Sequence, residues 1–117
     1  MALNAAGYTA AGAGTTAANG NYVPVTGAYA AFNGATQYFN GTYYLGYYFG
    51  WNISTDPNHS GGFSLYSDGG SGTTTSFLLT GWIAPSSGGT APAPTFSPIG
   101  GAAPAAAPRL QPRVVIF

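Results

Sequence analysis

Residues 42–53 read Thr-Tyr-Tyr-Leu-Gly-Tyr-Tyr-Phe-Gly-Trp-Asn-Ile, and this stretch decides the fold of the chain. From residue 43 onward, every second side chain is large and apolar, whereas glycine, tyrosine and asparagine occupy the positions between them. A period of two is typical of a β-strand with one buried face. The sequence therefore predicts a single long strand whose buried face carries Tyr43, Leu45, Tyr47, Phe49, Trp51 and Ile53.

Shorter strands are expected on both sides of this stretch. Asn-Gly pairs begin at Asn19, Asn33 and Asn40, and this dipeptide favours tight hairpin turns because both residues tolerate positive φ. No apolar stretch has a helical period. We expect an all-β domain, a small antiparallel meander forming a sandwich or an open barrel, with strands at residues 21–25, 28–32, 36–39, 62–67, 74–79 and 81–84. Phe63, Leu65 and Trp82 complete the predicted core, and Tyr66 is expected to point outward.

Composition divides the chain into a body and an arm. Residues 36–83 lack alanine although the chain has 20, and they hold 12 of its 18 aromatic residues. From residue 85 onward, proline and alanine dominate, which favours extended polyproline conformation over a packed core. The sequence therefore predicts a globular domain at residues 1–84 and an extended arm at residues 85–117.

The end of the arm is basic and apolar. A β-prone terminus of this kind can add to an exposed sheet edge of another protein. We expect it to dock onto a neighbouring subunit, although it could instead fold back as a strand of its own domain or fray. The docking residues predicted in this way are Arg109, Leu110, Arg113, Val114, Val115, Ile116 and Phe117.

The shortage of charged residues disfavours several classes of function. The chain has two Lys or Arg residues, two Asp or Glu residues and one histidine. Binding to nucleic acid needs clustered cations, and acid–base catalysis needs paired titratable groups. We therefore expect no enzyme activity, no cofactor and no nucleic-acid partner. The group Asp56, Asn58, His59 and Asp68 could suggest a metal site or a catalytic triad, but with no Cys, Glu or second His, turn formation is the better interpretation.

The start of the chain suggests synthesis in a cytoplasm. Residues 1–4 lack the basic start and the long apolar stretch of a secretory signal, and no segment reaches about 18 uninterrupted apolar residues. We expect no membrane insertion. A net charge near zero gives little electrostatic protection against association, which favours a homo-oligomer.

Exposed aromatic rings provide a candidate binding surface. Tyr44, Tyr48 and Tyr66 are expected on the outer face of the strands, where they could form a platform. Such a platform would either stack on sugar rings or be buried at a protein interface, where tyrosine is enriched.

Five segments together resemble a known type of module: Gly12–Tyr22, Phe32–Gly34, Tyr38–Tyr44, Trp51–Ser54, and Gly81-Trp82 followed by Gly88–Pro94. Over about residues 8 to 96 the chain is similar to a small Gly/Tyr-rich β module of tailed-bacteriophage virion proteins, which also occurs as repeats in bacterial surface proteins. The resemblance implies a non-catalytic structural or adhesive role.

The resemblance also implies a location and partners. A single copy with its own arm fits a small component of the virion surface, synthesised in the host cytoplasm. We expect a capsid decoration protein, anchored by the arm to a major capsid or tail protein and assembled as a homo-oligomer such as a trimer. The alternative is a tail or tail-fibre adhesin that binds a host-surface glycan. A fragment of a bacterial surface protein is disfavoured by the missing signal.

Overall fold

The computed structural model describes residues 3–59, 64–84 and 89–100. Phe63 of the predicted core and the arm residues from Arg109 to Phe117 lie outside these ranges. The described elements are β1 (Tyr8–Ala11), a 3-10 turn η1 (Thr16–Ala18), β2 (Gly20–Pro24), β3 (Ala31–Phe32), β4 (Ala35–Thr36), β5 (Tyr38–Phe39), β6 (Tyr44–Tyr47), β7 (Trp51–Ser54), β8 (Ser64–Ser67) and β9 (Thr95–Pro98).

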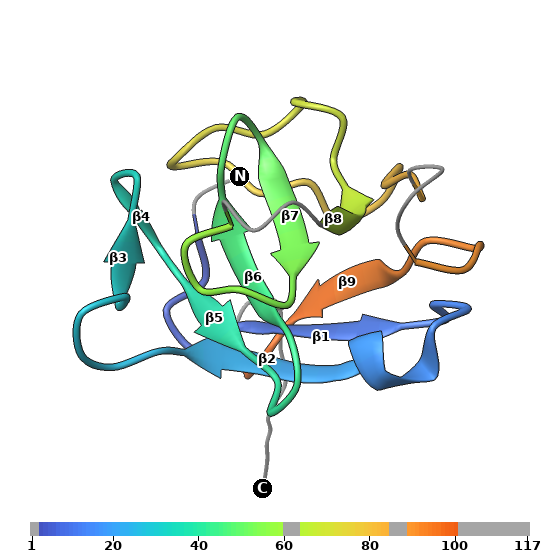
Figure 1. The fold of residues 1–117 in the computed structure, drawn as a ribbon, viewed down its shortest axis with the longest axis horizontal. Coiled ribbons are helices and arrows are strands. Elements are labelled where there is room, and N and C mark those ends of the chain that lie inside the picture. Colours follow the sequence, from blue (N-terminus) through green and yellow to red (C-terminus); the bar gives the residue numbers. More distant parts are fainter. Residues whose placement is uncertain (1–2, 60–63, 85–88, 101–117) are drawn as a thin grey trace, which may run out of the picture.

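Seven of the strands form one curled antiparallel sheet in the order β8-β7-β6-β5-β2-β1-β9, and β3 and β4 form a separate hairpin (Figure 1). The all-β prediction is confirmed, since η1 is the only helical turn in the part of the chain that the structure describes. Asn33 and Gly34 connect β3 to β4 with φ values of 53° and 84°. These positive values are what a two-residue hairpin turn requires, so the Asn-Gly signal is confirmed there.

The predicted long strand at 42–53 is wrong, because the chain turns back in its middle. β6 and β7 pair with Leu45 opposite Ile53 and Tyr47 opposite Trp51. Directly opposed residues of an antiparallel pair point to the same face. The odd-numbered residues therefore stay on one face after the turn, except Phe49 at its tip, which is 88% exposed rather than buried as predicted.

The domain boundary predicted after residue 84 is too early. β9 pairs with β1 along its whole length, from Tyr8 opposite Pro98 to Ala11 opposite Thr95, and Phe96 is buried. Residues 89–100 therefore belong to the body. The strands predicted at 74–79 and 81–84 are reduced to two isolated bridges, Thr73 with Ser76 and Ser67 with Ile83.

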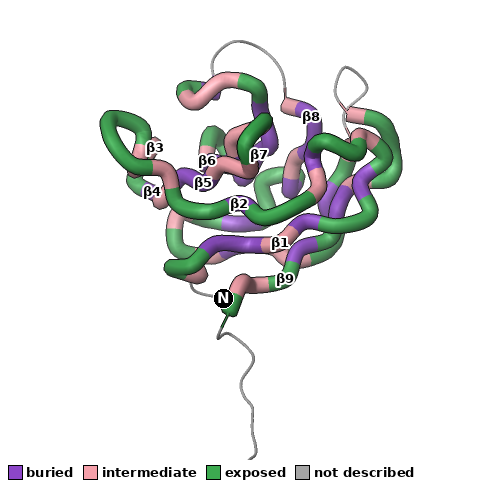
Figure 2. The backbone as a smooth tube through the Cα atoms, turned by 90° about the horizontal axis from the view of Figure 1, so that it is seen from below, coloured by how far each residue is buried: buried purple, intermediate pink, exposed green. Residues whose placement is uncertain are grey.

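The core is an aromatic cluster enclosed by the curled sheet and by residues 77–82. Figure 2 shows buried segments along β1, β7 and β8. Of the predicted core, Leu45, Trp51, Ile53, Leu65 and Trp82 are buried, and Tyr43 and Tyr47 are partly buried against them. The other large members of the cluster were not predicted from the sequence, and they are Tyr8, Tyr22, Tyr38, Tyr66, Phe77 and Phe96.

Phe77 is the hub of this cluster. Its ring stacks on Tyr8 at 4.0 Å between centroids and lies 5.2 Å from Trp51, 5.6 Å from Trp82 and 5.1 Å from Phe96. The polar atoms of the buried rings also have partners, since the indole N–H of Trp51 donates to the carbonyl oxygen of Thr73 at 2.9 Å. The cluster is therefore packed without unpaired indole groups at its centre.

Candidate functional site

The tip of the β6–β7 hairpin presents an aromatic side chain in a strained backbone position. Phe49 has a φ of 55° and Gly50 a φ of 127°. Left-handed backbone costs a residue with a side chain about 1–2 kcal/mol. Because the Phe49 side chain is 88% exposed, burial against the described residues does not offset that cost. The fold alone would favour glycine or asparagine at this position.

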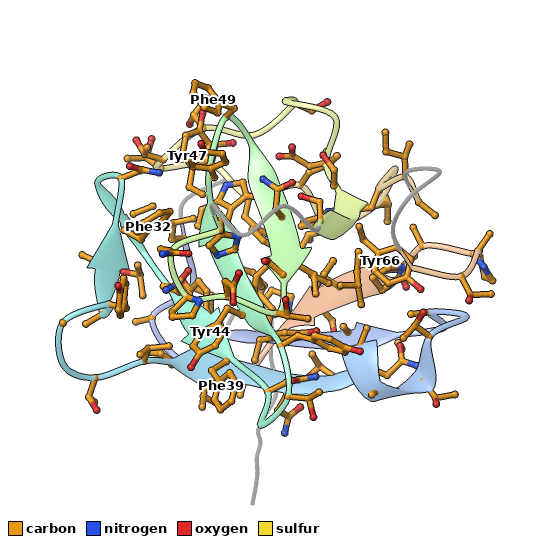
Figure 3. The ribbon with its side chains drawn as sticks, in the orientation of Figure 1. Phe32, Phe39, Tyr44, Tyr47, Phe49 and Tyr66 are labelled. Carbon is orange, nitrogen blue, oxygen red and sulfur yellow. The ribbon has the colours of Figure 1, made fainter. Side chains whose placement is uncertain are left out.

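The β3–β4 hairpin is fixed beside this tip. The side-chain N–H of Asn33 donates to the backbone carbonyl oxygen of Tyr47 at 2.9 Å. The ring of Phe32 stacks near that of Tyr48, with centroids 6.3 Å apart. Figure 3 shows Phe32, Tyr47 and Phe49 on the same side of the molecule, so two hairpins supply one site.

Between these hairpins lies a shallow, open hollow of about 280 Å³, lined by Asn33, Tyr47, Tyr48 and Phe49. Its walls are three aromatic rings and one amide, and none of the four residues carries a charge at neutral pH. The hollow can therefore offer flat apolar faces together with a few hydrogen-bonding groups.

Hydrogen bonds from the Asn52 side chain hold the backbone of the tip in place. The side-chain N–H groups of Asn52 donate to the carbonyl oxygens of Tyr48 at 2.8 Å and Gly50 at 2.9 Å. Its side-chain oxygen accepts a bond of 2.6 Å from the hydroxyl of Ser64. Tyr47 also packs edge-on against buried Trp51, with ring centroids 5.7 Å apart. The hollow is thus preorganised by residues that are themselves fixed.

The structure does not bring together the three tyrosines of the predicted platform. Tyr48 lies at the tip and is 38% exposed, whereas Tyr44 lies on the outer face of β6. Tyr66 is fully buried, and its hydroxyl accepts a bond from the backbone N–H of Thr15 at 3.0 Å and donates one to the carbonyl oxygen of Thr90 at 2.5 Å. Figure 3 shows Tyr44 and Tyr66 well apart.

Tyr44 instead belongs to a second aromatic surface, on the outer face of the sheet. Its ring stacks on Phe39 of the neighbouring strand at 4.4 Å between centroids. Phe39 in turn lies opposite Val23, which is 47% exposed. These three residues form an apolar row across β2, β5 and β6, of which only Tyr44 was predicted from the sequence.

The two strongest candidates for titratable chemistry have structural roles. Asp68 is buried, and its carboxylate accepts bonds of 2.8 Å from the backbone N–H groups of Gly70 and Gly72. His59 is also buried, and its Nε2–H donates to the side-chain oxygen of Gln37 at 2.6 Å. Gln37 is oriented for this by donating its own N–H to the carbonyl oxygen of Pro57 at 2.8 Å.

The described part of the loop around His59 forms a turn. The backbone N–H of His59 donates to the carbonyl oxygen of Asp56 at 3.2 Å. The imidazole stacks on Phe32, with centroids 5.5 Å apart. Within residues 3–59, 64–84 and 89–100, no group of three or more His, Cys, Asp or Glu residues could hold a metal ion.

Burial makes the stability of the fold sensitive to acid through His59. Desolvation lowers the pKa of its imidazole from 6.5 to about 4, and nearby Asp56 opposes this only in part. The unfolded chain therefore takes up a proton before the folded chain does, so stability is full above pH 6.5 and falls as the pH drops toward 4. We expect a loss of about 3 kcal/mol by pH 4.

Urea unfolding at a series of pH values between 7 and 4 measures this loss. A His59→Asn variant serves as the control, since asparagine tolerates the φ of 53° at this position and does not titrate. The variant should be less stable at pH 7 but should show a flatter pH dependence. Equal pH dependence of the two proteins would contradict the assignment to His59.

Comparison with known proteins finds no relative of this chain. No family model matches the chain, and neither a curated protein nor a solved structure matches it. In the described part of the chain, no helix is both long enough and apolar enough to cross a lipid bilayer.

Proposed function

We propose that this chain is a non-enzymatic structural protein of a bacteriophage virion, with capsid decoration as its leading role. The observation that supports a passive role is the use of His59 and Asp68 inside the fold, where both are buried and hydrogen-bonded. General acid–base catalysis needs a titratable pair within reach of a substrate. In the described residues this leaves Asp56 as the one remaining acidic side chain.

The surface of the body also suits a subunit that is covered by neighbours. The four charged residues of the chain are Asp56, Asp68, Arg109 and Arg113, and only the two aspartates lie in the described body. Large apolar side chains are exposed on it, among them Val23 at 47% and Ile83 at 53%. A neutral surface with exposed apolar groups favours association, and we propose a homo-oligomer such as a trimer.

Attachment to the particle is assigned to the C-terminal arm. The proposed partner is a major capsid or tail protein, and the proposed site is the virion surface. The sequence of the arm supports this role, because the apolar end Val114–Phe117 follows two arginines and a Pro/Ala-rich spacer. A β-prone segment of this kind can pair with an exposed strand of a partner.

A truncation that ends at Ala107 tests the attachment. The shortened chain retains every described element, up to residue 100, and should therefore fold as the full chain does. It should be depleted at least tenfold from purified particles, measured by quantitative mass spectrometry against the major capsid protein. A full-length control in which Val114–Phe117 are replaced by serines should show the same depletion. Normal incorporation of either chain would remove the arm from the proposal.

A second candidate is a tail or tail-fibre adhesin that binds a host-surface glycan. The observation that favours it is the strained and exposed Phe49 beside an uncharged hollow. A structural subunit that binds no ligand needs neither the strained, exposed Phe49 nor the hollow beside it. Both candidates are non-catalytic, and they differ in what the exposed surface contacts.

A further inference from the structure

The hairpin tip combines aromatic faces with hydrogen-bonding groups that the fold leaves unused. Asn33 makes one side-chain hydrogen bond within the described chain, to the carbonyl oxygen of Tyr47. Its amide oxygen and second N–H have no partner among the described residues, and the same holds for the hydroxyl groups of Tyr47 and Tyr48. An asparagine side chain can form four hydrogen bonds, and a phenol can both donate and accept. The hollow is therefore amphipathic.

The lining restricts the chemistry of a ligand. A purely apolar ligand would leave the amide of Asn33 and the two phenols without partners, which costs binding free energy. An anionic ligand would find no ionic partner, because none of the lining residues is charged and the described chain contains no Lys or Arg. A ring with apolar C–H faces and peripheral hydroxyl groups satisfies both conditions.

The size of the hollow points to a small ligand. Pockets for drug-sized molecules measure roughly 300–1,000 Å³, and this hollow of about 280 Å³ is open on one side. It can accept one sugar ring at the end of a glycan, with the rest of the glycan outside.

We propose that the tip of the β6–β7 hairpin binds the terminal ring of a neutral saccharide. Phe49 stacks on a C–H face of the sugar, and the ring of Tyr48, which stands at 73° to that of Phe49, contacts the edge of the sugar. Asn33 and the hydroxyl of Tyr47 bind its hydroxyl groups. Phe49 occupies its strained position because its ring is used for this contact. The inference rests on the second proposed function, the adhesin, and names its site and ligand class.

The test uses the purified full-length chain on an array of neutral and acidic glycans, followed by isothermal titration calorimetry with each neutral oligosaccharide that binds. The neutral probes end in hexoses or N-acetylhexosamines, and the acidic probes end in sialic or uronic acids. We expect binding to at least one neutral probe and none to the acidic probes.

Two substitutions remove the ligand contacts and suit the backbone of their turns, and Asn33→Gly also removes the hydrogen bond from the Asn33 side chain to the carbonyl oxygen of Tyr47. Phe49→Gly suits the φ of 55° at that position, and Asn33→Gly suits a φ of 53°, so both chains should fold. Each should weaken the affinity for the neutral probe at least tenfold. Tyr44→Ala is the matched control, because it removes an aromatic ring from the outer sheet face and should leave the affinity unchanged.

Several results would overturn the assignment of this site. These are an absence of binding to every neutral probe, binding only to acidic probes, or an affinity that Phe49→Gly leaves intact. Loss of self-association in Phe49→Gly, measured by analytical ultracentrifugation, together with no saccharide binding, would assign the tip to a contact between copies instead. Incorporation into particles is measured in a separate experiment. A negative result for saccharide binding therefore does not contradict the proposed attachment through the arm.

Discussion

Replacing Phe77 with alanine is expected to destabilise the fold by about 3–5 kcal/mol. The side chain is 3% exposed and contacts four other aromatic rings, from Tyr8 on β1 to Phe96 on β9. Because these rings lie on β1, β7, β9 and the segment that contains Trp82, they cannot all move inward to fill the space. Urea unfolding followed by tryptophan fluorescence measures the loss, since Trp51 and Trp82 both lie against Phe77.

The matched control for this substitution is Phe39→Ala. Phe39 is also a phenylalanine next to a tyrosine ring, but it lies half-buried on the outer face of the sheet. Its removal leaves no enclosed cavity and should cost about 1 kcal/mol. Similar losses from the two substitutions would show that the aromatic cluster is not the main source of stability.

Substitution of Gly7 by alanine is expected to cost about 2–5 kcal/mol. The residue precedes β1 and has a φ of 103°, which side chains rarely adopt. A Cβ atom there would overlap the backbone carbonyl oxygen of Tyr22 on β2. Since that oxygen is part of the main chain, only separation of the two strands would relieve the overlap.

Gly12→Ala separates the contribution of the overlap from that of the backbone strain. Gly12 has a φ of 81°, but a Cβ atom there would meet nothing within 4 Å. Its substitution should therefore cost only the strain, about 1–2 kcal/mol. Thermal unfolding of both variants measures the difference, and an equal fall in their midpoints would contradict the close approach of Gly7 to β2.

The sequence was sufficient to predict an all-β fold but not the turn inside residues 42–53. A hairpin centred on Phe49 places Tyr47 opposite Trp51 and Leu45 opposite Ile53. Its odd-numbered residues share one face, as they would in a single strand. The period-two pattern is thus the same for both structures, and the positive φ of Phe49 has no sequence signal, because phenylalanine rarely adopts it.

The prediction that Tyr66 points outward was wrong for a different reason. The register between β7 and β8 shifts next to Ile53, so that Tyr66 lies opposite Ile53 and shares its buried face. A β-bulge of this kind inserts one residue and reverses the alternation beyond it. The alternating pattern alone does not show where such an insertion occurs, and the predicted aromatic platform failed at this residue.

The strand β9 was missed because its composition resembles the spacer that follows it. It lies among prolines and alanines, and Phe96 is its only aromatic residue. Its pairing with β1 depends on contacts between residues 84 to 90 positions apart, from Ala11 with Thr95 to Tyr8 with Pro98. Local composition gives no information about such a contact. The candidate site was likewise found only in part, since Tyr48 was predicted but Asn33 and the exposed Phe49 were not.

The pairing of β1 with β9 also determines how the gene could be rearranged. Asn4 donates its side-chain N–H to the carbonyl oxygen of Ile99 at 2.9 Å, so both ends of the described body leave the sheet side by side. A short linker could join them, and new termini could be opened at a surface turn, which gives a circular permutant with the same strand order. For the same reason, the body could be inserted as a cassette into a loop of an unrelated host protein.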